Sequence, residues 1–422
     1  MEKTLVIILG ETRAWEKTYD NINQNVIVPL KADLCLCIGA KPEYNYDNPF
    51  YYNSKYRFLY DEPEDWGDAF NFAEYVVSND KSDTSTNTYE EFENKNAAFA
   101  KVQNYYDNTD NIHFLGRFTS LESLMKNKKV LSNNYEEIVY HQPIFIEDKW
   151  RYCAYGIIKS DYEVCPEYQD QYGVTTMRRR KQHISAGEGK WRKFLKIKSQ
   201  FLGGIRAAAD SEEQHPGSAG ILIFLRWFLW KNLEDTGIIN EYDRFIITRS
   251  DFIWRLEHPQ LELLSPDKIW VPNSEGYGGI TDRHAVIPRK YMKQYCNILE
   301  SMINETTGEL YYKEMQKLNS TGFYFNLERV IPFHLYHSGL DDEHLGFFPY
   351  VMFSIRPANV TSRWSMGTIY REDLDSYIKY VSEYNLSQDY VNDLLEWRDE
   401  HAGEILTITD YYRDRIPASL LS

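Results

Sequence analysis

The first forty residues alternate between apolar runs and a helical pattern. Residues 4–9, TLVIIL, form a continuous apolar run that ends at Gly10, and residues 34–38 form a second run that ends at Gly39. Such runs predict strands that are buried on both faces. Between them, from about residue 12 to residue 30, apolar side chains recur at helical spacing. Strand, helix and strand with short connections predict a βαβ unit of a parallel sheet, with a right-handed crossover.

The pattern resumes after a long polar stretch. Residues 41–109 are rich in Tyr, Asn, Asp and Glu, which predicts an exposed, irregular insertion. We therefore expect an α/β fold in which residues 1–40 and 110–360 form one sheet domain, followed by a C-terminal helical extension at 361–422. The expected elements after the insertion are short strands near 137–158, a helix at 218–234, strands at 244–248 and 268–272, a helix starting near Pro288, and two amphipathic helical segments between 372 and 405.

Charge and cysteine content narrow the classes of function. The chain carries a net charge of −16, which argues against a nucleic-acid partner because phosphate neutralisation needs a basic face. The five cysteines include no CxxC pair and no zinc-like spacing, so reduced, buried thiols and a cytoplasmic location are expected. The apolar run at the N-terminus is too short for a transmembrane segment, and Arg226 interrupts the run at 221–230. We expect a soluble protein.

A polar cluster closes the strand expected at 244–248. Arg249, Ser250 and Asp251 follow its apolar residues directly. In open α/β sheets, ligands bind outside the carboxyl ends of the strands, so these side chains are expected at a binding site. A carboxylate beside a cation suits a divalent ion together with a phosphate. The alternative is an ordinary ion pair at a strand end, with no ligand.

A glycine-rich segment, WVPNSEGYGGITDRHAVIPRK, begins at Trp270. Gly278 and Gly279 allow the backbone to approach a ligand closely. Asp282 and His284 share one side of the chain if it is extended there, and they can then act as a general base and the group that orients it. The alternative is that Asp282 forms a turn and His284 packs in the core.

Taken together, these segments resemble glycosyltransferases of the GT-A fold, of the kind found in large algal viruses and in surface-polysaccharide gene clusters. The resemblance lies in a strand that ends in Arg-x-Asp, a W-x-P segment, a Gly-Gly loop, an Asp-Arg pair and a following helix. The N-terminal βαβ segment and LERVIPFHLYHSGL, which starts at Leu327, are similar to segments of the same family. The resemblance covers about the first forty residues and residues 217–356.

The resemblance implies a GT-A-like, Rossmann-type, mostly parallel sheet flanked by helices, and a UDP- or GDP-sugar as donor. It implies that Mn²⁺ or Mg²⁺ binds at Asp251, which matches the last aspartate of the Asp-x-Asp motif, and that His334 or His337 completes the metal site. Arg249 replaces the first aspartate of that motif and can contact phosphate directly. The implied donor-binding residues are Gly10, Glu11, Thr12, Arg13, Arg249, Ser250, Gly278 and Gly279.

The expected activity is the transfer of a sugar from this donor to a glycan or another hydroxyl acceptor. Negative charge develops on the leaving diphosphate, and a metal ion and cations stabilise it. If the enzyme inverts the anomeric centre, Asp282 or Glu275 deprotonates the acceptor; a retaining enzyme needs no such base. Two alternatives are a non-catalytic carbohydrate-binding or scaffold protein, and a metal-dependent phosphoesterase that uses Asp251, Asp282 and His284 as ligands.

The basic segment at 177–198 has three interpretations. It contains nine lysines and arginines in a strongly acidic chain, and seven of them form two clusters: Arg178, Arg179, Arg180, Lys181, Lys190, Arg192 and Lys193. They can form a solvated face, clamp a diphosphate or an anionic glycan, or dock on an acidic membrane surface.

Overall fold

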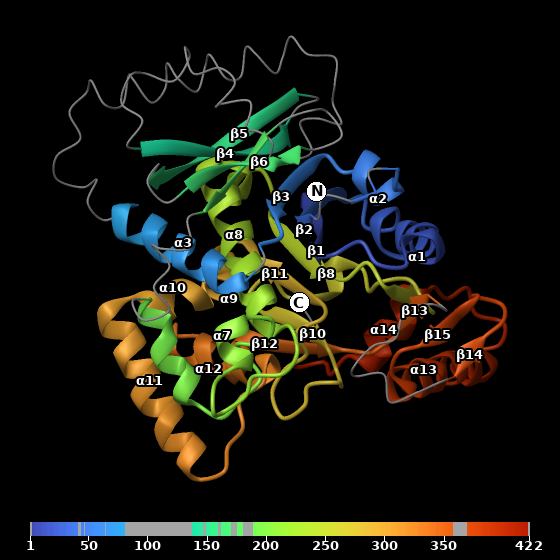
Figure 1. Ribbon diagram of the computed structural model, residues 1–422. Helices are drawn as coiled ribbons and strands as arrows, with labels where there is room; N and C mark the ends of the chain where they lie inside the picture. The colour runs from blue at the N-terminus through green and yellow to red at the C-terminus, as the bar shows by residue number, and fades with distance from the viewer. Residues whose placement is uncertain are drawn as a thin grey trace.

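The computed structural model describes residues 2–40, 44–45, 47–63, 65–80, 137–146, 149–158, 162–169, 175–179, 189–357 and 369–420. A mixed seven-stranded sheet lies in the middle of the molecule and helices flank it (Figure 1). A smaller antiparallel sheet lies with the C-terminal helices to one side. The architecture is therefore α/β with a helical C-terminal region.

The main sheet is mostly parallel. β1 pairs in parallel with β2 on one side and with β8 on the other, and β2 pairs in parallel with β3. β11 is antiparallel to both β8 and β10, while β10 is parallel to β12, so all strands except β11 run in the same direction. Across the sheet the strands lie in the order β3-β2-β1-β8-β11-β10-β12. The strands are β1 (Thr4–Gly10), β2 (Asp33–Ala40), β3 (Tyr56–Asp61), β8 (Arg244–Thr248), β10 (Ile269–Pro272), β11 (Ala285–Pro288) and β12 (Leu345–Phe348).

Helices and shorter turns connect these strands. The α-helices are α1 (Trp15–Ile22), α2 (Pro49–Tyr52), α3 (Trp66–Asp80), α7 (Arg206–Ala209), α8 (Ala219–Asp235), α9 (Met292–Cys296), α10 (Ile298–Ile303), α11 (Glu305–Ser320), α12 (Leu327–His337), α13 (Val381–Glu400) and α14 (Ile408–Arg415). A π-helical segment, η1 (Asn23–Ile27), continues α1. The 3₁₀ helices are η4 (Lys190–Lys196), η5 (Ile238–Asn240), η6 (Leu261–Leu263), η7 (Arg289–Tyr291) and η8 (Asp342–His344).

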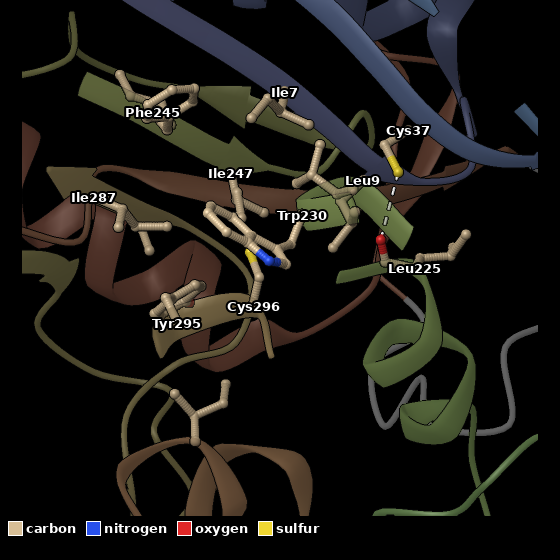
Figure 2. Close-up of a cluster of buried hydrophobic side chains, with 14 of the residues drawn as sticks. Ile7, Leu9, Cys37, Leu225, Trp230, Phe245, Ile247, Ile287, Tyr295 and Cys296 are labelled. Atoms are coloured by element: carbon tan, nitrogen blue, oxygen red, sulfur yellow. Dashed lines mark hydrogen bonds between the residues drawn. The ribbon is translucent and has the colours of Figure 1, made fainter. Parts of the chain in front are cut away.

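The core lies between the main sheet and α8. Every residue of β8 is buried, as are all residues of β1 except the last, and the middle of each strand is a run of apolar residues. Helix α8 is apolar on nearly all sides, as expected of a helix that packs on β1 and β2 and also contacts α3, α9 and α10. Figure 2 shows side chains of this layer, with the Cys37 thiol 3.5 Å from the carbonyl oxygen of Leu225. The expectation of free, buried thiols is confirmed for Cys35, Cys37 and Cys296.

The smaller sheet joins segments that are far apart in the sequence. Its strands lie in the order β14-β15-β13-β9, with neighbours antiparallel. β9 begins directly after Asp251, and β15 ends directly before Lys379. Its strands are β9 (Phe252–Trp254), β13 (Met352–Pro357), β14 (Tyr370–Arg371) and β15 (Ser376–Ile378). In Figure 1 these C-terminal strands and helices gather beside the sheet, away from α11.

Two hairpins complete the fold. β4 (Glu137–Ile146) pairs with β5 (Lys149–Ile158), and β6 (Tyr162–Gln169) pairs with β7 (Thr175–Arg179). The strands expected near 137–158 are thereby confirmed. The strands expected from the apolar runs around Thr4, Leu34, Phe245 and Ile269 are confirmed as well, and so is the helix at α8.

Other expectations about the elements are wrong in part. The stretch 41–109 is not irregular throughout, because β3 forms an edge of the main sheet and α3 packs on α8; residues 81–109 lie outside the described residues. The helix that follows Pro288 is preceded by β11, a strand that ends at this proline. The C-terminal extension contains β14 and β15 in addition to its two helices. Of the helices that the structure describes, none has both the length and the apolar character needed to cross a membrane.

Candidate functional site

A cavity of about 100 Å³ lies at the carboxyl ends of β1 and β8. From β1 the chain moves to β2 and β3 on one side, and later returns to β8 on the other side of β1. The cavity therefore lies at the point where the strand order reverses, which is the usual ligand position in open α/β sheets. It is lined by Leu9, Gly10, Glu11, Arg13, Glu62, Ser218, Ile221, Leu222, Ile247, Thr248, Arg249, Ser250, Asp251, Asp282 and Arg283.

The two loops that follow β1 and β8 are joined by one side chain. The Ser250 hydroxyl is 2.6 Å from the carbonyl oxygen of Glu11 and 3.2 Å from that of Arg13. Gly10 has a φ of 109°, a conformation that a residue with a side chain rarely adopts. The turn at Gly10 and the Ser250 contacts together hold Glu11 and Arg13, which form an ion pair, at the cavity.

Asp251 is held by two arginines. Its Oδ1 accepts a hydrogen bond of 2.8 Å from Arg249 Nε, and its Oδ2 accepts one of 2.7 Å from Arg249 Nη2 and another from Arg356 Nη1. Burial alone raises the pKa of the Asp251 carboxyl, but the charges of Arg249 and Arg356 outweigh it and hold the pKa well below its ordinary value. Asp251 is therefore a buried carboxylate in a bidentate ion pair.

The smaller sheet positions two basic residues, Arg356 and Lys379, near Asp251. The amide of Ile355 donates to the carbonyl oxygen of Asp251 at 2.9 Å, and Arg356 is the next residue of β13. The amide of Lys379 donates to the carbonyl oxygen of Ser354 at 2.9 Å. Burial lowers the pKa of Lys379, and the nearby charges of Arg249 and Arg356 lower it further. The charge of Asp251 opposes them, and the resulting pKa is about 6.

A second ion-pair group surrounds Arg283. Its guanidinium donates to Glu383, a fully buried carboxylate in the first turn of α13, and lies 3.5 Å from Glu275. Glu383 also accepts hydrogen bonds from the Tyr350 hydroxyl at 3.0 Å and the Ser354 amide at 2.8 Å. Arg283 is thus neutralised from two sides, and the C-terminal helix is tied to the cavity wall.

Asp282 lines the cavity, and its carboxylate lies 3.9 Å from Nε of Arg283. Its backbone carbonyl accepts a hydrogen bond of 2.9 Å from Nη2 of Arg226, which is fully buried on α8. Glu328, in the first turn of α12, has its pKa raised to about 7 by burial and by the charge of Asp282. Of these two residues only Asp282 lines the cavity, where a carboxylate can exchange a proton with a hydroxyl.

The structure brings together some of the residues expected at the site. Those that line the cavity are Gly10, Glu11, Arg13, Arg249, Ser250, Asp251 and Asp282. Thr12 does not line it, because its hydroxyl lies 2.9 Å from that of Tyr44. Glu275 lies behind Arg283, and the remaining residues, Gly278, Gly279, His284, His334 and His337, also lie elsewhere.

The glycines of the loop after β10 serve packing against α12. A Cβ atom on Gly279 would lie 1.9 Å from the carbonyl oxygen of Glu328, and one on Gly278 would lie 2.5 Å from the Arg329 guanidinium. The φ angles of Glu275 and Tyr277 are 54° and 42°, left-handed values that cost about 1–3 kcal/mol each for non-glycine residues. The backbone at these two glycines therefore lies close to α12 and not to a ligand site. The geometry gives no support for their expected role in donor binding.

The histidines also point away from the cavity. The Nε2 of His284 lies 3.2 Å from that of His258, and its Nδ1 lies 3.0 Å from the Thr248 hydroxyl, so it does not orient Asp282. On α12, Nδ1 of His334 lies 2.9 Å from the Tyr311 hydroxyl, and His337 pairs with Glu314 at 2.8 Å. Asp282 is therefore not paired with His284, which packs in the core as the alternative interpretation has it, and Asp251 is not grouped with the α12 histidines.

The groups around Asp251 do not fit a divalent ion. Both of its oxygens already accept hydrogen bonds from guanidinium groups. Across the described ranges, no three or more His, Cys, Asp or Glu side chains are grouped so that they could hold a metal. Cations lie where a metal would have to bind. From the sequence we expect that activity requires a metal ion, and this expectation remains a prediction.

Local patterns hinted at the residues that the sequence analysis missed. FSIRP at 353–357 and SYIK at 376–379 alternate apolar and polar residues, which is the period of a half-buried strand. Recognised as strands, they would have placed Arg356 and Lys379 in a sheet. No local pattern shows that this sheet begins at Asp251.

Two lysines of the basic segment at 177–198 lie on the surface. Lys190 pairs with Glu305 at 3.0 Å, and Lys193 pairs with Glu309 at 3.3 Å, both on α11. For these two lysines the geometry supports the solvated-face interpretation. Arg180 and Lys181 lie outside the described residues.

Comparisons of the chain with protein-family models, with curated proteins and with solved structures found no match.

Proposed function

We propose that the chain is a glycosyltransferase that moves a sugar from a UDP- or GDP-sugar to a glycan or another hydroxyl acceptor. The observation that carries the proposal is the cavity at the switch point between β1 and β8, where arginine side chains converge beside the carboxylate of Asp282. Doubly wound sheets bind nucleotides at this position. The resemblance of the same segments to GT-A enzymes agrees with it.

The geometry suits the electrostatic demand of the reaction. Charge develops on the diphosphate as the bond to the sugar breaks, and fixed cations stabilise that charge without reorganising. Arg13 and Arg249 both line the cavity, and Asp251 holds the Arg249 guanidinium in one orientation. Two further carboxylates of the lining, Glu11 and Glu62, can accept hydrogen bonds from ribose hydroxyls.

Asp282 is the group that we assign to the acceptor in an inverting reaction. Asp282 lines the cavity, and its backbone is held by Arg226. There it can take the proton of an acceptor hydroxyl as the oxygen attacks the anomeric carbon, with the diphosphate leaving. In a retaining reaction Asp282 would have no such role.

The test is nucleotide release from a panel of UDP- and GDP-sugars, together with calorimetric binding of the nucleoside diphosphates. Asp282→Asn should lower turnover by about a hundredfold or more while leaving donor binding intact. Asp267→Asn, at an exposed ion pair with Lys290, is the matched control. If no nucleoside diphosphate binds the wild-type chain, the proposal is wrong.

A non-catalytic carbohydrate-binding or scaffold protein is the second candidate. The observation that favours it is the engagement of both Asp251 oxygens by arginines, which leaves Asp251 with no direct chemical role. Such a protein would bind a glycan or a nucleotide and release no nucleotide from any donor. The phosphoesterase alternative has no favouring observation, because His284 contacts Thr248 and His258 rather than Asp251 and Asp282.

A further inference from the structure

Positive charge exceeds negative charge by one within the group formed by Arg249, Arg356 and Asp251. Arg249 and Arg356 both contact this one carboxylate, and Lys379 lies close enough for its pKa to respond to all three. The other arginines at the cavity have their own carboxylates: Arg283 has Glu383 and Glu275, and Arg13 has Glu11. Lys379 adds little charge at neutral pH, because burial and the neighbouring arginines lower its pKa to about 6, and its Nζ lies 4.7 Å from the centre of the Tyr380 ring.

This excess charge is buried except at one point. The side chains of Asp251 and Arg356 are 2% and 4% exposed, whereas that of Arg249 is 23% exposed and lines the cavity. A buried charge without a partner is costly, so a cluster with surplus cations favours an anion at its open side. The open side is the guanidinium of Arg249.

Binding of a divalent cation at Asp251 is unfavourable. To bind Asp251 the cation would have to displace guanidinium N–H groups from the carboxylate oxygens and remain beside their positive charges. A planar guanidinium, by contrast, matches a phosphate group and offers it two donors in a fixed geometry. Arg249 retains Nη1 for such a contact, since its Nε and Nη2 donate to Asp251.

We infer that the donor's diphosphate binds directly to Arg249 without a divalent ion, and that Asp251 is a positioning residue for this arginine and not a metal ligand. The inference rests on the proposed function, because it concerns how the same cavity holds a nucleoside diphosphate. Arg356 does not line the cavity, so it acts through its charge and by holding Asp251. It is placed by β13 of the smaller sheet, which gives that sheet a part in donor binding.

The experiment is calorimetric titration of the full chain with UDP, GDP and inorganic pyrophosphate, in EDTA and again with excess Mn²⁺. Direct binding predicts dissociation constants that agree within about twofold between the two conditions. Arg249→Gln should weaken binding by at least about tenfold in both. Arg249→Lys, which keeps the charge and loses the fork, should recover only part of the affinity.

Arg289→Gln is the matched control. Arg289 forms an ion pair with Asp243 at the other end of β8, and its loss should leave all three titrations unchanged. Thermal melting of each variant shows whether it folds. The comparison of wild-type chain in EDTA and Mn²⁺ decides the inference even if a variant fails to fold.

Each negative result of these titrations has a different consequence. If a nucleoside diphosphate binds only in the presence of Mn²⁺, the inference is wrong and the proposed function stands. If none binds in either condition, both are wrong. If binding without metal is unaffected by Arg249→Gln, the assignment of Arg249 is overturned while a nucleotide site remains.

Discussion

Glu383 accepts a hydrogen bond from Arg283, and both side chains are buried although they are separated by a hundred residues of sequence. The pair joins the first turn of α13 to the cavity wall that follows β10. Arg283 keeps Glu275 as a second carboxylate at 3.5 Å, and its ring contact with Tyr380 is 4.4 Å from the centroid. The C-terminal helices are therefore part of the site's frame.

The first prediction concerns this ion pair. Glu383→Gln should lower the free energy of unfolding by about 3 kcal/mol, because removing one partner leaves a buried charge poorly compensated. Urea denaturation measures the loss. Asp267→Asn, which breaks the exposed pair with Lys290, should cost less than about 1 kcal/mol. Equal losses in the two variants would show that the Arg283 pair contributes no more than a surface pair does.

The second prediction concerns the role of Gly279. Gly279→Ala should lower the free energy of unfolding by about 3 kcal/mol or more, because the new Cβ would lie 1.9 Å from the backbone oxygen of Glu328 and α12 would have to move. Gly237→Ala is the control: its φ is 74° and no atom lies within 4 Å, so only the left-handed backbone costs, by about 1 kcal/mol. A Gly279→Ala variant as stable as wild type, with weaker nucleotide binding, would instead support the donor-binding role expected from the sequence.

The elements that were predicted correctly share a physical reason. β1, β8 and α8 are buried on all or nearly all sides, so each contains a run of apolar residues that can be recognised in the sequence. Because parallel strands end at a common edge, the rule that ligands lie there was enough to select Arg249, Ser250 and Asp251 before any coordinates. These three residues do line the cavity.

The elements that were missed carry weak local signals. β11 has four residues, and β3 is an edge strand within a polar stretch, so neither gives a long apolar run. Arg356 reaches Asp251 across 105 positions of sequence, a relationship set by the pairing of β9 with β13. The glycines and histidines after β10 were misassigned for the related reason that residue type alone does not reveal which neighbour a side chain packs against.

The third prediction is a loss of stability at acidic pH caused by the buried imidazoles. Burial lowers the pKa of His258 from 6.5 to about 4, and burial followed by the charge of His258 lowers the pKa of His284 well below 6.5. The unfolded chain therefore binds more protons than the folded chain between these values, so stability falls as pH falls from about 6.5 towards 4. His258 alone should account for about 2 kcal/mol at pH 5.

Urea denaturation at pH 7.5 and pH 5 measures this loss. His258→Gln should reduce the difference between the two pH values, while His334, whose pKa burial also lowers to about 4, maintains part of it. His344→Gln, on the surface, is the matched control and should retain the full difference because the buried pair is intact. A difference that is the same in all three proteins would rule out the buried pair as its source.

The fourth prediction has the opposite sign and concerns Glu328. Burial and the charge of Asp282 raise the pKa of Glu328 from 4.5 to about 7, so the folded chain binds more protons than the unfolded chain between these values. The neutral form of Glu328 then stabilises the folded chain fully below about pH 4.5. This contribution to the free energy of unfolding is lost as pH rises towards 7, by an amount on the order of 2 kcal/mol. Glu328→Gln removes the titrating proton, and it should be more stable than wild type at pH 8 and similar to it at pH 4.

The same titration tests whether the carboxyl groups of Asp282 and Glu328 interact. Asp282→Asn removes the neighbouring charge, so the pKa of Glu328 should fall towards 4.5, although burial continues to hold it above that value. Carbon-13 chemical shifts of the labelled Glu328 carboxyl follow its pKa directly in both proteins. If Asp282→Asn leaves that pKa at its wild-type value, the two carboxyls do not interact, and Asp282 would act on an acceptor without a partner acid on α12.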